Sequence, residues 1–96
     1  MSSDSVPAEL LAARENIDRI DRELISLLAE RFALTHEVGL LKADKKLKAL
    51  DSSRESEKLA ELPALCEEHD LDPALVSELF SRIMEEVVKN HQRLRD

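Results

Sequence analysis

Residues 8–42, AELLAARENIDRIDRELISLLAERFALTHEVGLLK, decide the fold of this chain. Apolar side chains recur in this stretch at spacings of three and four, the period of one face of an α-helix. They are Leu10, Ala13, Ile17, Ile20, Leu24, Leu27, Leu34, Val38 and Leu41. No proline interrupts the stretch, and the only glycine of the chain, Gly39, lies near its end. The pattern therefore predicts one long helix with a continuous apolar stripe.

The predicted helix is too long for a chain of 96 residues to cover by itself. At ~1.5 Å per residue it is roughly 50 Å long, whereas a compact domain of this size has a diameter of roughly 26 Å. Part of the apolar stripe then needs cover from another molecule. A second copy of the chain is the simplest source, so we expect a homodimer.

Two shorter helices are predicted after a polar connection at residues 43–51. Ser52 and Glu55 have the spacing of a capping box, which places the start of the second helix near Ser53. Pro63 lies within this helix and should kink or split it, because proline lacks the backbone N–H that an interior helical position needs.

The third helix begins with a strong local signal. Asp72 followed by Pro73 is typical of an N-cap and a proline at the first helical position. The helix should run to about Arg93. The chain is thus predicted to be all-α, with one domain at residues 8–96 after a disordered start at residues 1–7.

Composition and charge exclude several classes of function. The chain has 21 acidic and 14 basic residues, and its net charge of −7 disfavours nucleic acid or an anionic membrane as a partner. A single cysteine, Cys66, cannot form an internal disulfide, which fits a reducing compartment. The start of the chain has no apolar run typical of a signal peptide. We therefore expect a cytoplasmic protein.

Two basic residues of the long helix lie within its apolar stripe. Arg31 and Lys42 fall close together on a helical wheel, in the arc that holds Leu24 and Val38. Their stems could lie on apolar surface while the charged ends reach water, or they could form buried ion pairs. A pocket for a small polyanion is the alternative, because the planar fork of arginine binds carboxylates with two hydrogen bonds.

Distance along the helix separates a third basic residue from this pair. Arg31 and Lys42 are roughly 16 Å apart, and two long side chains could bracket one small ligand. Arg14 lies roughly 25 Å before Arg31, too far to reach the same ligand from the same chain. If Arg14 takes part, it comes from a partner that packs antiparallel. The spacing thus implies a dimeric helical protein that binds an anion, without naming the anion.

The order of these residues resembles the all-helical class of chorismate mutases, the small bacterial chorismate mutase domain. The resemblance extends from about Leu10 to Gln92 and needs no gaps. The residues that carry the resemblance are Arg14-Glu15 with Ile17, Asp21, Leu27-Leu28-Ala29-Glu30-Arg31, Glu37-Val38-Gly39, Lys42, Asp51-x-x-Arg54-Glu55, Leu79-Phe80 with Ile83, and Glu85. It implies an intertwined dimer with two identical sites. It also implies an isomerase of the shikimate pathway, which converts chorismate to prephenate for phenylalanine and tyrosine biosynthesis.

The resemblance also implies a role for each cation. Arg14 of the second chain and Arg31 of the first would each hold one substrate carboxylate, and Arg54 would help to bind the dianion. Lys42 would donate a hydrogen bond to the ether oxygen as its bond breaks. From the residues alone, Arg54 is equally explained as a solvated partner of Glu57.

The two acidic residues at the start of the second helix have implied roles as well. Glu55 would accept a hydrogen bond from the substrate hydroxyl, with Asp51 beside it. Local structure offers an alternative for both, because Glu55 has the capping-box position and Asp51 suits a turn or a cap.

Two positions of the third helix depart from the family pattern. Val87 replaces a small hydroxyl residue and cannot donate a hydrogen bond to the substrate. His91 replaces Gln or Glu, and its strength as a donor to the ether oxygen depends on its protonation. A histidine near a helix end is otherwise often a surface or capping residue.

The chemistry implied by the resemblance needs no metal or cofactor. His36 and His69 lack the spacing of metal ligands, and no glycine-rich phosphate loop is present. A pericyclic rearrangement requires a site that holds a flexible substrate in a compact geometry. Two alternatives remain open: an isochorismate-pyruvate lyase on the same fold, and a non-catalytic helical dimerisation or regulatory module.

Overall fold

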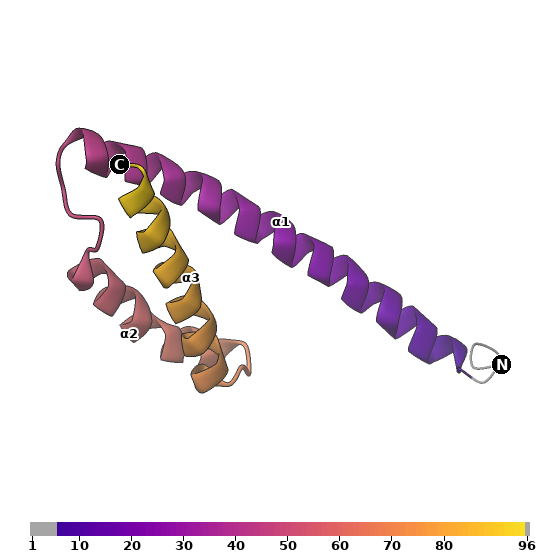
Figure 1. The fold of residues 1–96 in the computed structure, drawn as a ribbon. Coiled ribbons are helices and arrows are strands. Elements are labelled where there is room, and N and C mark those ends of the chain that lie inside the picture. Colours follow the sequence, from indigo (N-terminus) through magenta and orange to yellow (C-terminus); the bar gives the residue numbers. More distant parts are fainter. Residues whose placement is uncertain (1–5, 96) are drawn as a thin grey trace. The chain divides into compact units, whose positions relative to one another are not determined.

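A computed structural model describes residues 6–95 and shows three helices in this part of the chain (Figure 1). They are α1 (Ala8–Asp44), α2 (Ser52–Glu68) and α3 (Pro73–Arg93). No strand occurs among the described residues, so the predicted all-α class is confirmed. The sequence predicts a disordered start at residues 1–7, of which residues 1–5 lie outside the described residues. Within residues 6–95, no helix combines the length and apolar character that crossing a bilayer requires.

The chain divides into two compact units, the first ending at Ala33 and the second beginning at Leu34. In the described residues, the first unit consists of the greater part of α1, without a second helix to pack on. Its large aliphatic side chains are 40–69% exposed, namely Leu10, Leu11, Ile17, Ile20, Leu24, Ile25, Leu27 and Leu28. A single helix cannot bury its own apolar stripe, and this one leaves the stripe open to solvent.

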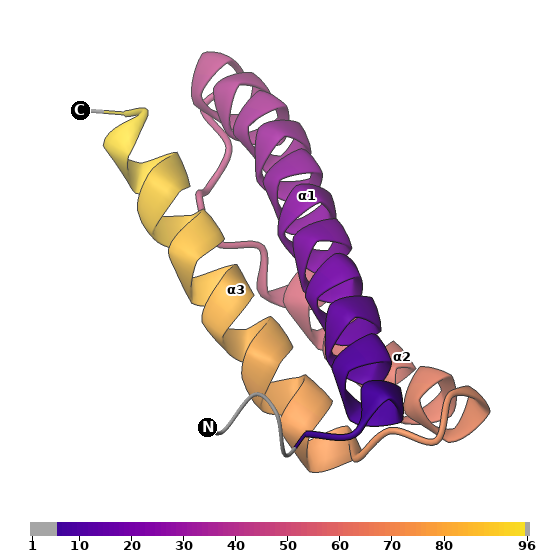
Figure 2. The same ribbon diagram turned by 90° about the vertical axis from the view of Figure 1, so that its right-hand side faces the viewer.

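The second unit contains a helical hairpin in which α3 packs against α2 (Figures 1 and 2). Leu62 and Cys66 of α2 are only 2% exposed and form its buried apolar centre. The Lys58 ammonium of α2 lies 5.8 Å from the centre of the Phe80 ring of α3, within the range of a cation–π contact. Apolar burial therefore concentrates between α2 and α3.

The start of α2 differs by one residue from the sequence prediction. Asp51, and not Ser52, is the N-cap, and its carboxylate accepts a hydrogen bond of 3.0 Å from the backbone N–H of Arg54. Ser52 is already the first helical residue. A carboxylate at the cap position also interacts favourably with the positive end of the helix dipole. At the start of α3, the predicted cap is confirmed, because the Asp72 carboxylate accepts from the backbone N–H of Ala74 at 3.1 Å.

Pro63 does not split α2, contrary to one of the two outcomes predicted for it. The helix is continuous from Ser52 to Glu68 with Pro63 inside it. Leu62 directly precedes Pro63, and Cys66 follows it by about one turn. Both side chains are buried. This burial holds the two halves of α2 in one helix and offsets the hydrogen bond that proline removes.

Two helices end in the same way, without the glycine that usually marks such an end. At the end of α1, Leu47 N–H donates to the Lys42 carbonyl at 2.8 Å and Lys46 N–H donates to the Ala43 carbonyl at 3.2 Å. These are the two bonds of a Schellman motif. Lys46 has the positive φ of 58° that the motif requires, and Asp70, with a φ of 54°, has the same position after α2. The motif reverses the chain after α1.

Candidate active site

The connection after α1 forms a surface pocket around Lys42 in the second unit. The pocket is lined by Lys42, Leu47, Lys48, Leu50, Asp51, Ser52 and Ser53. Lys42 is half-buried, and its ammonium donates a hydrogen bond of 3.3 Å to the backbone carbonyl of Ala49. The reversal of the chain at Lys46 brings this carbonyl to the lysine. Lys42 and Asp51, two predicted site residues, thus line one pocket, together with a second cation, Lys48.

The start of α2 presents three predicted site residues within five positions. The Asp51 carboxylate is engaged as the cap of α2. The Arg54 side chain is exposed and lies 3.9 Å from Glu57, as the local alternative predicts. Such an exposed ion pair holds its partners weakly, so the guanidinium can turn towards an anion. Glu55 is half-buried.

The end of α3 brings His91 against the last turns of α1, within the second unit. His91 is 3% exposed, so the surface position considered for it is wrong. Its Nε2 atom lies 2.8 Å from the carbonyl oxygen of Thr35. The ring also packs on Gly39, where an added Cβ would lie 2.5 Å from the ring carbon Cδ2. Val87 lies one turn before His91 and is half-buried.

The remaining two predicted residues, Arg14 and Arg31, lie in the first unit. Arg14 is exposed and Arg31 is half-buried. Because both belong to the same helix, seventeen residues apart, their backbones are about 25 Å from each other. One α1 helix therefore cannot bring Arg14 and Arg31 to the same small ligand.

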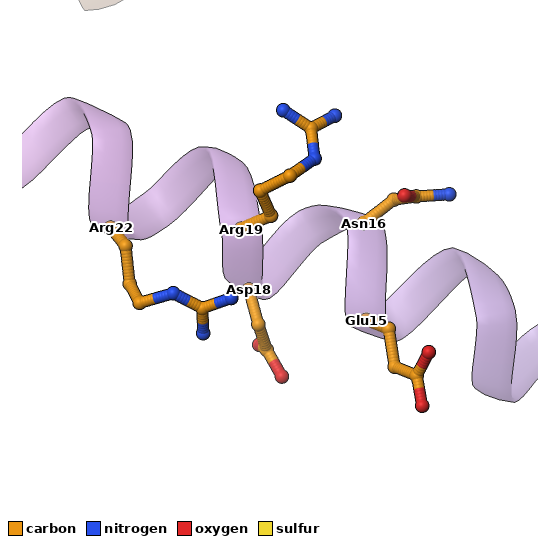
Figure 3. A pocket seen from close by; sticks show the side chains of 5 residues that line it. All are labelled: Glu15, Asn16, Asp18, Arg19 and Arg22. Atoms are coloured by element: carbon orange, nitrogen blue, oxygen red, sulfur yellow. The ribbon is translucent and has the colours of Figure 1, made fainter.

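A second surface depression lies on α1 and has no counterpart among the predicted site residues. Figure 3 shows its side chains projecting from neighbouring turns of one helix: Glu15, Asn16, Asp18, Arg19 and Arg22. Arg19 pairs with Glu23 at 2.9 Å, and both side chains are more than half exposed. These residues form a solvated, charged helix surface. Across residues 6–95, His, Cys, Asp and Glu side chains form no group of three that could hold a metal ion.

Three residues that the sequence does not predict as site residues lie beside predicted ones in the structure. Lys48 belongs to the polar connection predicted at residues 43–51, and its position at the pocket depends on the turn after α1. Thr35 contacts His91 through a backbone carbonyl, which no side-chain pattern could signal. Gly39 did carry a signal, because a single glycine inside a helix indicates close approach by another element.

Comparisons of this sequence with a family model and with known proteins all indicate the same family. A family model described as chorismate mutase type II matches residues 13–92. The bifunctional chorismate mutase/prephenate dehydratase of Escherichia coli strain K12 is 40% identical over 85 residues, which cover 88% of this chain and 22% of that protein. The T-protein of Enterobacter agglomerans is 37% identical over 79 residues, 82% of this chain and 21% of its own length.

A shorter relative matches over most of its length. The chorismate mutase of Methanocaldococcus jannaschii is 30% identical over 77 residues, which cover 80% of this chain and 78% of that protein. The chain thus spans about a fifth of the bifunctional relatives and most of this archaeal one. The family match includes Arg14, Arg31, Lys42, Arg54 and His91, and the chain belongs to the chorismate mutase type II family.

Proposed function

We propose that this chain is a chorismate mutase, an isomerase that converts chorismate to prephenate. The observation that carries the proposal is the family match over residues 13–92, which contains every predicted site residue. The archaeal relative, which the chain covers over 78% of its length, is named for this activity alone. The proposal concerns the mutase reaction only, because the matched region is the part shared by all these relatives.

The proposed mechanism uses the cations of the site to compact and stabilise the substrate. Arg14, Arg31 and Arg54 bind the two carboxylates of chorismate and hold the flexible molecule in a chair-like geometry. The ether C–O bond then breaks as the new C–C bond forms, within one molecule. Negative charge grows on the ether oxygen, and a positioned donor stabilises it. Lys42 is the proposed donor: its side chain is half-buried and lines the pocket, and its ammonium donates to the Ala49 carbonyl at 3.3 Å.

We also propose that the active protein is an intertwined antiparallel homodimer with two shared sites. Two observations support this. The apolar stripe in the first unit is exposed over its whole length, from Leu10 to Leu28. Arg14 and Arg31 lie about 25 Å apart on one helix. An antiparallel second copy would cover the stripe and supply its Arg14 beside the Arg31 of the first chain.

Direct assay of the purified chain tests the activity. We expect chorismate to disappear and prephenate to form without added metal or cofactor. Lys42→Ala should lower kcat by about 10²–10³-fold, the scale of one lost transition-state donor. Lys45→Ala is the matched control, because it removes an exposed lysine of the same connection that does not line the pocket. Circular dichroism should show the same helix content in all three proteins.

Two results would contradict this assignment. A helical wild-type protein that leaves chorismate unchanged would refute the mutase activity, and turnover of isochorismate instead would favour the lyase. Equal losses in Lys42→Ala and Lys45→Ala would show that lysine charge in the connection matters in general, without a specific donor at residue 42.

A further inference from the structure

The two ring nitrogens of His91 have different surroundings. Nε2 lies 2.8 Å from the Thr35 carbonyl oxygen. A carbonyl oxygen can only accept a hydrogen bond, so Nε2 must carry the hydrogen. Nδ1 is out of contact with solvent and has no hydrogen-bond partner among residues 6–95. In the neutral ring, the hydrogen on Nε2 leaves Nδ1 bare, as an acceptor only.

Packing keeps the ring in this orientation. Gly39 approaches so closely that an added Cβ would lie 2.5 Å from His91 Cδ2 and 2.8 Å from Leu94 Cδ1. Turning the ring over about its Cβ–Cγ bond would place a carbon, instead of Nε2, against the Thr35 carbonyl. This part-buried hydrogen bond would be lost, which costs free energy. Thr35 and Gly39 therefore act as positioning residues for His91.

We propose that this arrangement holds neutral His91 as the Nε2–H tautomer, so that His91 can donate to a ligand only as the imidazolium, through Nδ1. The consequence for catalysis rests on the proposed function. The rearrangement builds negative charge on the ether oxygen, and that oxygen needs a donor. A glutamine at this position would offer an N–H at every pH, whereas neutral His91 offers a lone pair. His91 thus assists the reaction only when it is protonated.

The elements packed near His91 carry both charged and uncharged residues. On α1, the charged residue Lys42 follows Gly39 by three residues on the same helix face. On α2, which packs against α3, the charged residues Arg54 and Glu55 occupy the first turn. Val87 of α3 and Leu94, the C-cap that follows α3, are the uncharged neighbours one turn before and after His91. A bound dianion adds negative charge and favours the imidazolium.

Nitrogen-15 NMR of the full chain with labelled histidine tests the tautomer without any activity. Wild-type protein above the titration range should show a protonated Nε2 and a bare Nδ1 for His91, with the resonances assigned by their loss in His91→Gln. His36 and His69 are exposed and serve as internal references for rings that exchange between tautomers. A protonated Nδ1 in neutral His91 would overturn the proposal.

Kinetics between about pH 5 and 8, where histidine ordinarily changes its charge, test the catalytic consequence. We expect wild-type kcat to fall by several-fold as the pH rises through this window, while His91→Gln stays level. His36→Gln is the matched control and should keep the wild-type profile. A level wild-type profile would overturn the requirement for the imidazolium. Absence of turnover in every variant would refute the proposed mutase, and the NMR spectra would still decide the tautomer.

Discussion

Gly39 occupies a helical position where glycine is normally unfavourable. A glycine inside a helix destabilises it by about 0.5–1 kcal/mol relative to alanine, because the free backbone loses more entropy on folding. In this protein the missing side chain leaves room for His91, whose ring carbon lies where a Cβ would collide with it. The contact joins residues far apart in the chain and outweighs the local preference for alanine.

We predict that Gly39→Ala destabilises the protein, in the opposite direction to the usual effect in a helix. The Leu94 methyl can move aside, but the His91 ring is held by the Thr35 carbonyl. Overpacking of this kind costs about 1–3 kcal/mol in the free energy of unfolding. Urea denaturation at constant protein concentration would measure it.

The double variant Gly39→Ala/His91→Ala supplies the control. Removing the ring removes the obstacle, so the alanine at position 39 should cost less in the His91→Ala background than in the wild type. Strictly additive effects, or a more stable Gly39→Ala protein, would show that the close approach of Gly39 and His91 does not constrain the fold.

The N-terminus of α2 combines a structural and a proposed functional role in one residue. Asp51 caps the helix through the Arg54 N–H and also lines the pocket of Lys42. Asparagine and aspartate cap helices about equally well, whereas alanine cannot cap. This difference allows the two roles of Asp51 to be separated.

We predict that Asp51→Ala lowers the free energy of unfolding by about 1 kcal/mol, while Asp51→Asn changes it by only a few tenths. Asp51→Asn should nevertheless lower kcat/KM by about 2–10-fold, the effect of one weakened hydrogen bond. Chemical denaturation and chorismate kinetics on the same preparations would measure both. Asp72→Ala, which removes the cap of α3 away from the pocket, should reduce stability with little change in kcat. Full activity of Asp51→Asn would leave Asp51 as a cap alone.

The exposed apolar stripe of α1 bears on the oligomeric state that we expect for the protein. From Leu10 to Leu28, eight large aliphatic side chains are at least 40% exposed. Contiguous apolar surface of this kind is typical of an interaction site, because soluble monomers rarely leave it open. Residues of the second unit cluster around α2 and α3, whose buried apolar centre is small. Stability of the folded chain should therefore depend on protein concentration.

We predict that active sites are shared between chains. Arg14→Ala and Arg31→Ala homodimers should each lose almost all activity, because every site lacks one arginine. A mixed dimer of the two variants has one intact site, so co-refolding should restore up to half the activity per mixed dimer. Kinetic assay of the isolated mixed dimer, obtained with differently tagged chains, would measure this.

Sedimentation of the wild type is the companion measurement and should give a dimer at micromolar concentration. A wild-type monomer with full activity would contradict the shared site. A mixed dimer that forms but stays inactive would also contradict the shared site.

Periodicity and local signals were sufficient to predict three helices, the long α1, and the start of α3 at Asp72 and Pro73. These features depend on residues within one or two turns, and local sequence contains that information. The ordered basic residues likewise indicated the family, because their separations follow the helices. The start of α2 lies one residue before the predicted one, since Ser52 and Asp51 are both good caps and only backbone geometry distinguishes them.

Other features of the protein depend on the tertiary structure and could not be predicted from local sequence. His91 is buried and bound to a carbonyl 56 residues earlier, so neither its burial nor its tautomer could follow from its neighbours in α3. The ends of α1 and α2 lack glycine, and Lys46 and Asp70 take its place at positive φ. Burial of Leu62 and Cys66 keeps α2 whole around Pro63. At Pro63 the free energy of packing outweighs a local conformational preference, and at Lys46 and Asp70 the hydrogen bonds of the chain reversal do so. Residue preferences alone describe only the local conformation.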